Sequence, residues 1–420
     1  MAIIDKPLPN TDEANKPEDK AVEIETVKSA EVVDTPTGPV EVDMTEDGGA
    51  EVSFDPNASE IDPSQDHFAN LAENMDDADL EPLGSKLIEQ YNEYRESRAD
   101  WEDTYRNGLS LLGFKYERRT EPFRGASGVN HPVLAESVTQ FQAQAYKELL
   151  PSDGPVRTQI LGDVNVAKEE QAKRVKDFMN YQIMDQMKEY EPEFDQMLFY
   201  LPLSGSTFKK VYYDDLLGRA VSKFVPADDL IVPYSANSLE DAEAVIHVIK
   251  ISENELRKQQ VAGFYRDIEL GDPPITENQL QDKKLELEGI QKDGQEDQYT
   301  LYEIHTNLDL DGYEDVGEDG EPTGIKLPYV ITVAQANSKV LSIRRNYKAE
   351  DPKKNKINYF VQFKFLPGTG FYGFGLIHMI GGLTRTATAA LRQLLDAGTL
   401  ANLPAGFKSR GIRVRDDAQP

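Results

Sequence analysis

The most constraining feature of this sequence is a long amphipathic helix predicted near its C-terminal end. Six apolar residues share one helical face because they recur at steps of three and four residues. They are Leu376, Ile380, Leu383, Ala387, Leu391 and Leu394. Thr388, Arg392 and Asp396 form a second, polar stripe. Residues 376–397 would make a rod roughly 33 Å long at the α-helical rise, and the upstream chain is expected to hold this rod in place.

A strand and a glycine-rich turn are predicted directly before this helix. Aromatic and branched residues alternate there at Tyr359, Val361, Phe363 and Phe365, which favours a strand. Pro367 and Gly368 should end it, because proline cannot donate to a ladder and glycine favours turns.

The turn also carries the spacing GxGxxG, at Gly368, Gly370 and Gly373. A dinucleotide fold requires a second parallel strand and an acidic residue about 20 positions further on, but here the predicted helix continues through that point. The bulky pair Phe371-Tyr372 also occupies the place where backbone should approach a pyrophosphate. We interpret the motif as a packing turn, and keep a nucleotide-binding enzyme that uses the GTGFYG turn as an alternative.

Charge is distributed unevenly along the 420 residues, whose net charge is −30. Residues 1–82 hold 23 acidic and 4 basic residues, whereas residues 338–415 hold 3 acidic and 14 basic residues. A chain this acidic is not expected to bind nucleic acid over its whole surface, although its basic end could contact phosphate locally. The alternative for that basic run is a solvated or salt-bridged face.

The first 82 residues are predicted to be a disordered acidic arm, since they have almost no aromatic residues to offset chain entropy. The chain has no cysteine, which excludes disulfides and thiolate chemistry. No signal peptide and no apolar run of membrane-spanning length is present, so we expect a soluble protein made inside a cell.

Helices are predicted to dominate the first part of the body, residues 83–205. A long helix is marked by Leu87, Tyr91, Tyr94, Trp101, Tyr105 and Leu112. A second is marked by Leu134, Val138, Phe141, Ala145 and Leu149, and a third, over about 166–190, by Val175, Phe178, Ile183 and Met187. A short strand is expected at 158–161.

From Ser206 the apolar period changes to two, which predicts antiparallel strands as far as Tyr347, interrupted by polar helical sequence over 252–298. Pro226 and Pro233 should confine one short strand, with Leu230 and Ile231 on opposite faces. The predicted fold class is therefore α+β: helices, then a mostly antiparallel sheet, then the long helix.

Residues 307–318 have the spacing of a calcium loop, with candidate ligands Asn307, Asp309, Asp311, Asp315 and Glu318. The flanking sequence predicts strands rather than helices, so an exposed acidic hairpin loop is the preferred interpretation. A calcium-binding adaptor remains the second alternative function.

No catalytic signature is present: the sequence lacks GxSxG, HExxH and GxxxxGK[ST]. The five histidines are scattered, and one on a helix, such as His378, is more often a packing or hydrogen-bonding residue than a catalyst. We expect no enzyme activity, no cofactor, no metal and no catalytic residue.

Four segments resemble bacteriophage portal proteins, the head–tail connectors of tailed phages, and are most similar to the large portals of short-tailed phages. They are PFRGASGVNHPVLAESV (122–138), LPLSGSTFKKVYYD (201–214), VPADDLIVPYSANSLEDAEAVIH (225–247) and GFYGFGLIHMIGGLTRTATAALRQLLDAG (370–398). The resemblance covers Leu83 to Arg415 and rests on the order of the segments and on their general residue pattern, not on one decisive set of residues.

The resemblance implies a homo-oligomeric ring, usually of twelve subunits, at one vertex of the capsid in the virion, assembled in the host cytoplasm. Double-stranded DNA would pass through it during packaging and ejection. Its expected partners are the large terminase, the major capsid protein, the scaffold and the tail adaptor proteins, with no membrane.

By this analogy residues 83–367 would be the wing-like α+β body, and 368–403 the glycine-rich turn and first stem-like helix. Residues 404–420 would begin a clip-like region, with the basic run Lys408, Arg410, Arg413 and Arg415. The expected subunit-interface or channel residues are Leu376, Ile380, Leu383, Arg385, Thr388, Leu391, Arg392 and Leu394. Portal proteins continue through a second stem helix and a crown, so the chain is expected to be a fragment, a split gene product or a truncated reading frame.

Overall fold

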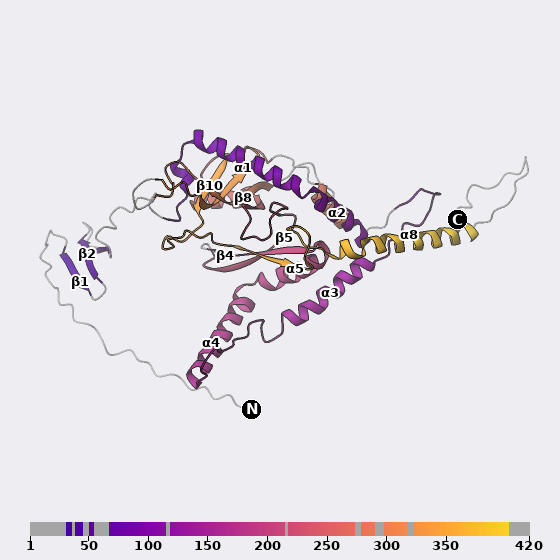
Figure 1. Cartoon of the computed structure of the whole chain (residues 1–420), viewed down its shortest axis with the longest axis horizontal. Helices are drawn as coiled ribbons and strands as arrows, with labels where there is room; N and C mark the ends of the chain where they lie inside the picture. Colours follow the sequence, from indigo (N-terminus) through magenta and orange to yellow (C-terminus); the bar gives the residue numbers. More distant parts are fainter. Residues whose placement is uncertain are drawn as a thin grey trace, which may run out of the picture. The chain divides into compact units, whose positions relative to one another are not determined.

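The computed structural model divides into two compact units, Met1–Asp66 and His67–Pro420, each considered by itself (Figure 1). In the first unit, β1 (Glu31–Thr35), β2 (Gly38–Met44) and β3 (Ala50–Ser53) pair in the order β1-β2-β3, with antiparallel partners. All other described elements belong to the second unit. The structure describes residues 31–35, 38–44, 50–53, 67–114, 118–214, 217–273, 279–289, 298–316 and 322–402.

The prediction of a disordered arm over residues 1–82 is wrong in two places. Residues 31–53 contain the three strands just named, and residues 67–82 belong to the folded second unit. A short 3₁₀ helix, η3 (Leu71–Asn74), buries Leu71 completely, and Leu80 is buried at the start of the next helix. The composition of residues 1–82 is dominated by acidic residues, so it gave no indication that Leu71 and Leu80 are buried. The rest of the predicted arm lies outside the described residues.

The long helix predicted from Leu83 is two helices, α1 (Asp77–Ser97) and α2 (Ala99–Leu109), followed by the 3₁₀ turn η4 (Ser110–Leu112). Arg98 stands between them in a non-helical conformation, with φ −108° and ψ 10°. The apolar face itself is confirmed, because all six of its predicted positions, Leu87, Tyr91, Tyr94, Trp101, Tyr105 and Leu112, are buried.

Two antiparallel sheets confirm the predicted change of period after Ser206. One has the order β10-β9-β8-β7-β6 and the other the order β11-β4-β5. Leu230 and Ile231 belong to different hydrophobic clusters, as expected for opposite faces of one strand. The strands are β4 (Ser206–Asp214), β5 (Arg219–Pro226), β6 (Leu230–Ile231), β7 (Ala244–Ser252), β8 (Gln298–Leu308), β9 (Leu327–Ala334), β10 (Val340–Arg345) and β11 (Phe360–Lys364).

Helices cover these sheets and supply two large cores. Helix α1 lies on the five-stranded sheet, where Tyr91 stacks on Tyr302 with ring centroids 4.0 Å apart (Figure 1). The second core joins α2, α3 (Val133–Leu149), the three-stranded sheet and the start of the last helix. The last helix is therefore anchored in the body at its N-terminal end.

Three further predictions about the helical part are corrected. Leu149, at the end of α3, is exposed, and residues 158–161 form no strand. The third helix is α4 (Val166–Tyr181), continued by a π-helical turn over 182–186, and none of its residues is buried. Its predicted apolar residues Val175 and Phe178 are exposed, because α4 packs on no large core.

The remaining described helices are α5 (Tyr190–Ser204), α6 (Glu253–Val261), α7 (Gln279–Glu288) and α8 (Leu376–Asn402). Helix α8 is the predicted long helix, 27 residues in length, and it extends away from the sheets of its unit (Figure 1). Within the described ranges, no helix combines the length and the hydropathy needed to cross a bilayer.

Candidate functional site

The glycine turn before α8 fits against the loop that joins α5 to β4. The Gly373 N–H donates to Ser206 Oγ at 2.7 Å, and the Phe374 N–H donates to the Leu366 carbonyl at 3.0 Å. A Cβ atom on Gly373 would lie 2.5 Å from the Gly205 carbonyl oxygen, so two stretches of backbone meet where no side chain fits. The glycines of this turn thus accommodate the chain's own backbone.

The two bulky residues of the turn are part of the core. Phe371 and Tyr372 are both buried, and the Tyr372 ring stacks on Trp101 of α2 with centroids 4.6 Å apart. The Gly370 backbone lies against the ring of Tyr234. The GTGFYG turn is therefore filled with protein atoms, which removes the basis for the nucleotide-binding alternative.

His378 is a hydrogen-bonding residue at the start of α8. Its Nδ1 accepts the Gly375 N–H at 3.1 Å, and partial burial lowers the pKa of the imidazole. The side chain therefore satisfies one of the backbone donors that every helix leaves unpaired at its N-terminus.

Helix α8 changes its surroundings halfway along its length. In the first half, Ile377, Gly381 and Thr384 are buried against the body. In the second half, among the described residues beyond Thr384, only Asp396 is buried. The outer half of α8 is therefore held in another way, through hydrogen bonds made by the side chains of its polar stripe.

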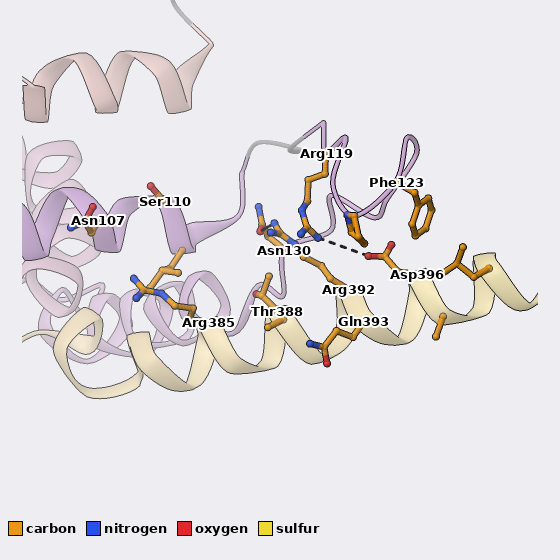
Figure 2. Close-up of a pocket in the computed structure, with 15 residues that line it drawn as sticks. Asn107, Ser110, Arg119, Phe123, Asn130, Arg385, Thr388, Arg392, Gln393 and Asp396 are labelled. Carbon is orange, nitrogen blue, oxygen red and sulfur yellow. Dashed lines mark hydrogen bonds and ion pairs between the residues drawn. The ribbon is translucent and has the colours of Figure 1, made fainter.

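The support is a segment that we call the strap, residues 118–131, which lies between η4 and α3 (Figure 2). Three side chains of the polar stripe bind its backbone. The Ser127 N–H donates to Asp396 Oδ1 at 2.6 Å, Arg392 Nε donates to the Val129 carbonyl at 2.7 Å, and the His131 N–H donates to Thr388 Oγ1 at 3.0 Å. We call these three bonds the ladder.

The spacing of the ladder follows from the geometry of helix and strap. Four helical residues advance about 6 Å along the axis, and two residues of extended chain advance about 6.6 Å. Side chains at every fourth position of α8 can therefore bind alternate strap residues, here 127, 129 and 131, in the opposite chain direction. The three bonds of the ladder thus join side chains of α8 to backbone groups of the strap.

A cavity of about 710 Å³ lies beside the ladder, between α8, the strap and the end of α2 (Figure 2). Its charged lining consists of Arg119, Arg385, Arg392 and Asp396. Arg119 lies 3.9 Å from Asp396 and also donates to the Ser127 carbonyl, while Arg392 contacts the Asn130 side chain as well. The guanidinium groups of Arg119 and Arg392 thus hold the strap.

The face of α8 opposite the strap is apolar. At about 100° per residue, seven positions from Met379 to the end of α8 lie within about 40° of the direction opposite Arg392. Leu383 is 66% exposed and Leu394 is 71% exposed, values unusual for leucines in one continuous stripe. We call this set the outer stripe; it consists of Met379, Leu383, Ala387, Ala390, Leu394, Ala397 and Ala401.

The predicted interface or channel residues divide between these surfaces. Leu376 and Ile380 pack partly against the core of their own chain, and Leu391 is half-buried. Leu383 and Leu394 belong to the outer stripe, whereas Thr388 and Arg392 bind the strap of their own chain instead of facing outwards. Arg385 is exposed at the cavity. The basic run Lys408, Arg410, Arg413 and Arg415 lies outside the described residues.

The candidate calcium loop is only partly described. Asn307 belongs to strand β8, and Asp315 is bound by Lys354 and by the Thr323 hydroxyl. Within the described ranges, no group of three or more acidic or histidine side chains is placed to hold a metal ion.

Residues 208–412 match the model of a protein family described as phage SU10 portal protein. The matched range starts in β4 and includes every later described element through α8. A comparison with curated proteins found no match. The family match covers just under half of the chain and supports a phage portal protein.

Proposed function

We propose that this chain is the subunit of a phage portal ring at one vertex of the capsid, of the kind found in short-tailed phages. The ring would consist of about a dozen identical copies around a channel for double-stranded DNA. The large terminase would dock on it during packaging, and the capsid, scaffold and tail adaptor proteins would bind its outer surfaces. The match to the portal family supports the class of protein.

The observation that carries the proposal is the outer stripe of α8. Its own body and strap already occupy the other side of the helix, so this chain's described residues leave most of the stripe exposed, above all Met379, Leu383 and Leu394. Exposed apolar surface that is continuous over six helical turns indicates a protein interface. A second copy of the chain fits best, because a head-to-tail contact repeated by rotation closes into a ring.

The charge of the chain is consistent with a channel. With a net charge of −30, the protein as a whole repels a DNA phosphate backbone and does not bind it tightly. DNA that must move past a ring during packaging and ejection requires such weak contact. The calcium-adaptor alternative has no comparable support.

The test is self-association of the full chain, measured by native mass spectrometry at micromolar concentration. The wild-type chain should form oligomers, and the double variant Leu383→Asp, Leu394→Asp should be monomeric, because it places charges in an apolar interface. The matched control is Val261→Asp with Ile325→Asp, two exposed apolar residues elsewhere in the body, which should associate like wild type. A wild-type chain that stays monomeric, or a stripe variant that still associates, contradicts the proposal.

A further inference from the structure

We infer that the strap is a built-in alignment device: it fixes the rotation of the outer half of α8, so that the outer stripe and not the polar stripe faces a second copy of the chain. This inference rests on the proposed function, because it assigns the strap a role in assembly. Thr388, Arg392 and Asp396 are then positioning residues that act through the backbone of residues 127–131.

The first argument is that little else fixes the outer half of α8. Beyond Thr384, the described residues of α8 bury only Asp396, and the side chain of Asp396 is held by the strap. A helix held at one end alone can bend and twist about that end. The three ladder bonds extend over two turns, from Thr388 to Asp396, and therefore oppose rotation as well as bending.

The second argument is that the ladder and the outer stripe are on opposite sides of one helix. Whatever side the strap occupies is unavailable to another subunit, and the opposite side is then the accessible one. Rotation of the outer half by a single residue, about 100°, would turn Leu383 and Leu394 away from a neighbour. Identical copies can close a ring only if each presents the same surface at the same angle, so a fixed rotation is a requirement for uniform assembly.

The third argument is the position of the strap in the chain. Its C-terminal end leads directly into α3, whose Leu134 and Val138 are buried in the core shared with α2 and the start of α8. The strap is thus attached to the rigid part of the body one residue after its last ladder bond at His131, which is followed by Pro132 and the start of α3. A short attachment to a packed helix transmits the position of the body to α8.

The test removes the ladder and keeps both stripes. The ladder variant Thr388→Val, Arg392→Met, Asp396→Ala lacks all three side-chain partners of the strap. The conservative variant Thr388→Ser, Arg392→Lys, Asp396→Asn retains an acceptor, a donor and an acceptor at the same positions. The control variant Gln393→Met changes an exposed residue at the same cavity whose side chain takes no part in the ladder.

The first readout is hydrogen exchange at a concentration where the chain is monomeric. In the ladder variant the amides of Ser127 and His131, and those of residues 388–402, should exchange faster on the order of tenfold or more, because each lost hydrogen bond stabilised the closed state. The amides of β7 and β8 should be unchanged. The conservative variant should restore most of the protection, and the control variant should resemble wild type.

The second readout is the distribution of oligomers in native mass spectrometry. The ladder variant should give a broadened mixture of sizes where wild type gives a narrower one, and the conservative variant should narrow it again. Unchanged exchange in the ladder variant overturns the inference, and so does faster exchange with a wild-type distribution of oligomers. Should the triple variant not fold, Asp396→Ala alone is tested with the same two readouts.

The two proposals fail in different ways. A wild-type chain that never associates overturns the proposed function, and the alignment role with it, whatever the exchange data show. A wild-type chain that associates through the outer stripe, together with a ladder variant that exchanges and assembles like wild type, overturns the alignment role alone.

Discussion

Arg98 donates a hydrogen bond from Nη1 to the hydroxyl of Tyr372 at 2.8 Å, across 274 residues of sequence. The guanidinium is almost completely buried and also binds the carbonyls of Ala227, Asp228 and Leu230, at 2.8, 2.7 and 3.0 Å. Tyr372 in turn donates to the Leu230 carbonyl at 3.0 Å. One side chain therefore joins the α1–α2 junction, the loop before β6 and the turn that leads into α8.

Replacing Arg98 by methionine should destabilise the chain by about 3 kcal/mol or more, because several buried carbonyls would lose their donor. Urea unfolding followed by circular dichroism measures this. The matched control is Arg106→Met in α2, whose ion pair joins a partly buried guanidinium to the exposed carboxylate of Asp103 and should contribute less than about 1 kcal/mol. Equal losses in the two variants would contradict the central role of Arg98.

The sequence contained a signal for Arg98 and for its ion pair with Glu102, four residues on, but not for its carbonyl partners. Tyr91, Tyr94, Arg98 and Trp101 follow one another at helical spacing, so Arg98 stands as a charged residue within an apolar face. Such a residue must be paired when it is buried. Its backbone acceptors are carbonyls in a turn about 130 residues away, and no local pattern encodes which carbonyls those are.

Helix α8 and the strap show the same division between local and distant information. The period of 3.6 residues predicted α8 and its polar stripe, because a helix is determined mainly by neighbouring residues. The strap pairs with that stripe across 257 to 269 residues, through an irregular backbone that has no period. The predicted helix is therefore confirmed, whereas the role of Thr388 and Arg392 as subunit-interface or channel residues stays a prediction.

Substitution by alanine should have opposite effects on the stability of the protein at Gly373 and at Gly382. A Cβ on Gly373 would lie 2.5 and 2.6 Å from the carbonyl oxygens of Gly205 and Leu366, so Gly373→Ala should cost about 1–3 kcal/mol through overpacking. Gly382 is in α8 with open space around its Cα, so Gly382→Ala should stabilise the helix by up to about 1 kcal/mol. Melting temperatures of the two variants give the comparison. A neutral Gly373→Ala would show that the turn has room for a side chain.

Two N-terminal deletions should distinguish residues that do not contribute to the stability of the body from residues that do. Removal of residues 1–66 should change the free energy of unfolding of the body by less than about 0.5 kcal/mol, since the two units are compact on their own. Removal of residues 1–82 also takes away Leu71 and Leu80, and each buried leucine contributes about 1.5–3 kcal/mol. The longer deletion should therefore lower the melting temperature strongly. Equal stability of the two truncated chains would contradict the boundary at His67.

Asp229 is a partly buried carboxyl next to the Asp228 carboxyl. Burial, with the adjacent Asp228 carboxyl, raises the pKa of Asp229 to about 7, against the opposing influence of Lys284, Arg98 and Lys250. Lys284 of α7 binds Asp228 at 2.7 Å and leaves Asp229 without an equivalent ion pair among the described contacts. The folded state consequently favours the protonated form of Asp229.

The sign of the pH dependence follows from this raised pKa. The stabilisation from protonated Asp229 is fully present below the pKa of the unfolded chain, near 4, and it is lost progressively as the pH rises through about 7. Asp229→Asn keeps the neutral form at every pH, so its gain in stability over wild type should be larger at pH 8 than at pH 5 by about 1–3 kcal/mol. Urea unfolding of both proteins at the two pH values measures the difference, with the exposed Asp100→Asn as the control. A gain of the same size at pH 5 and pH 8 would show that Asp229 does not titrate with folding in this window.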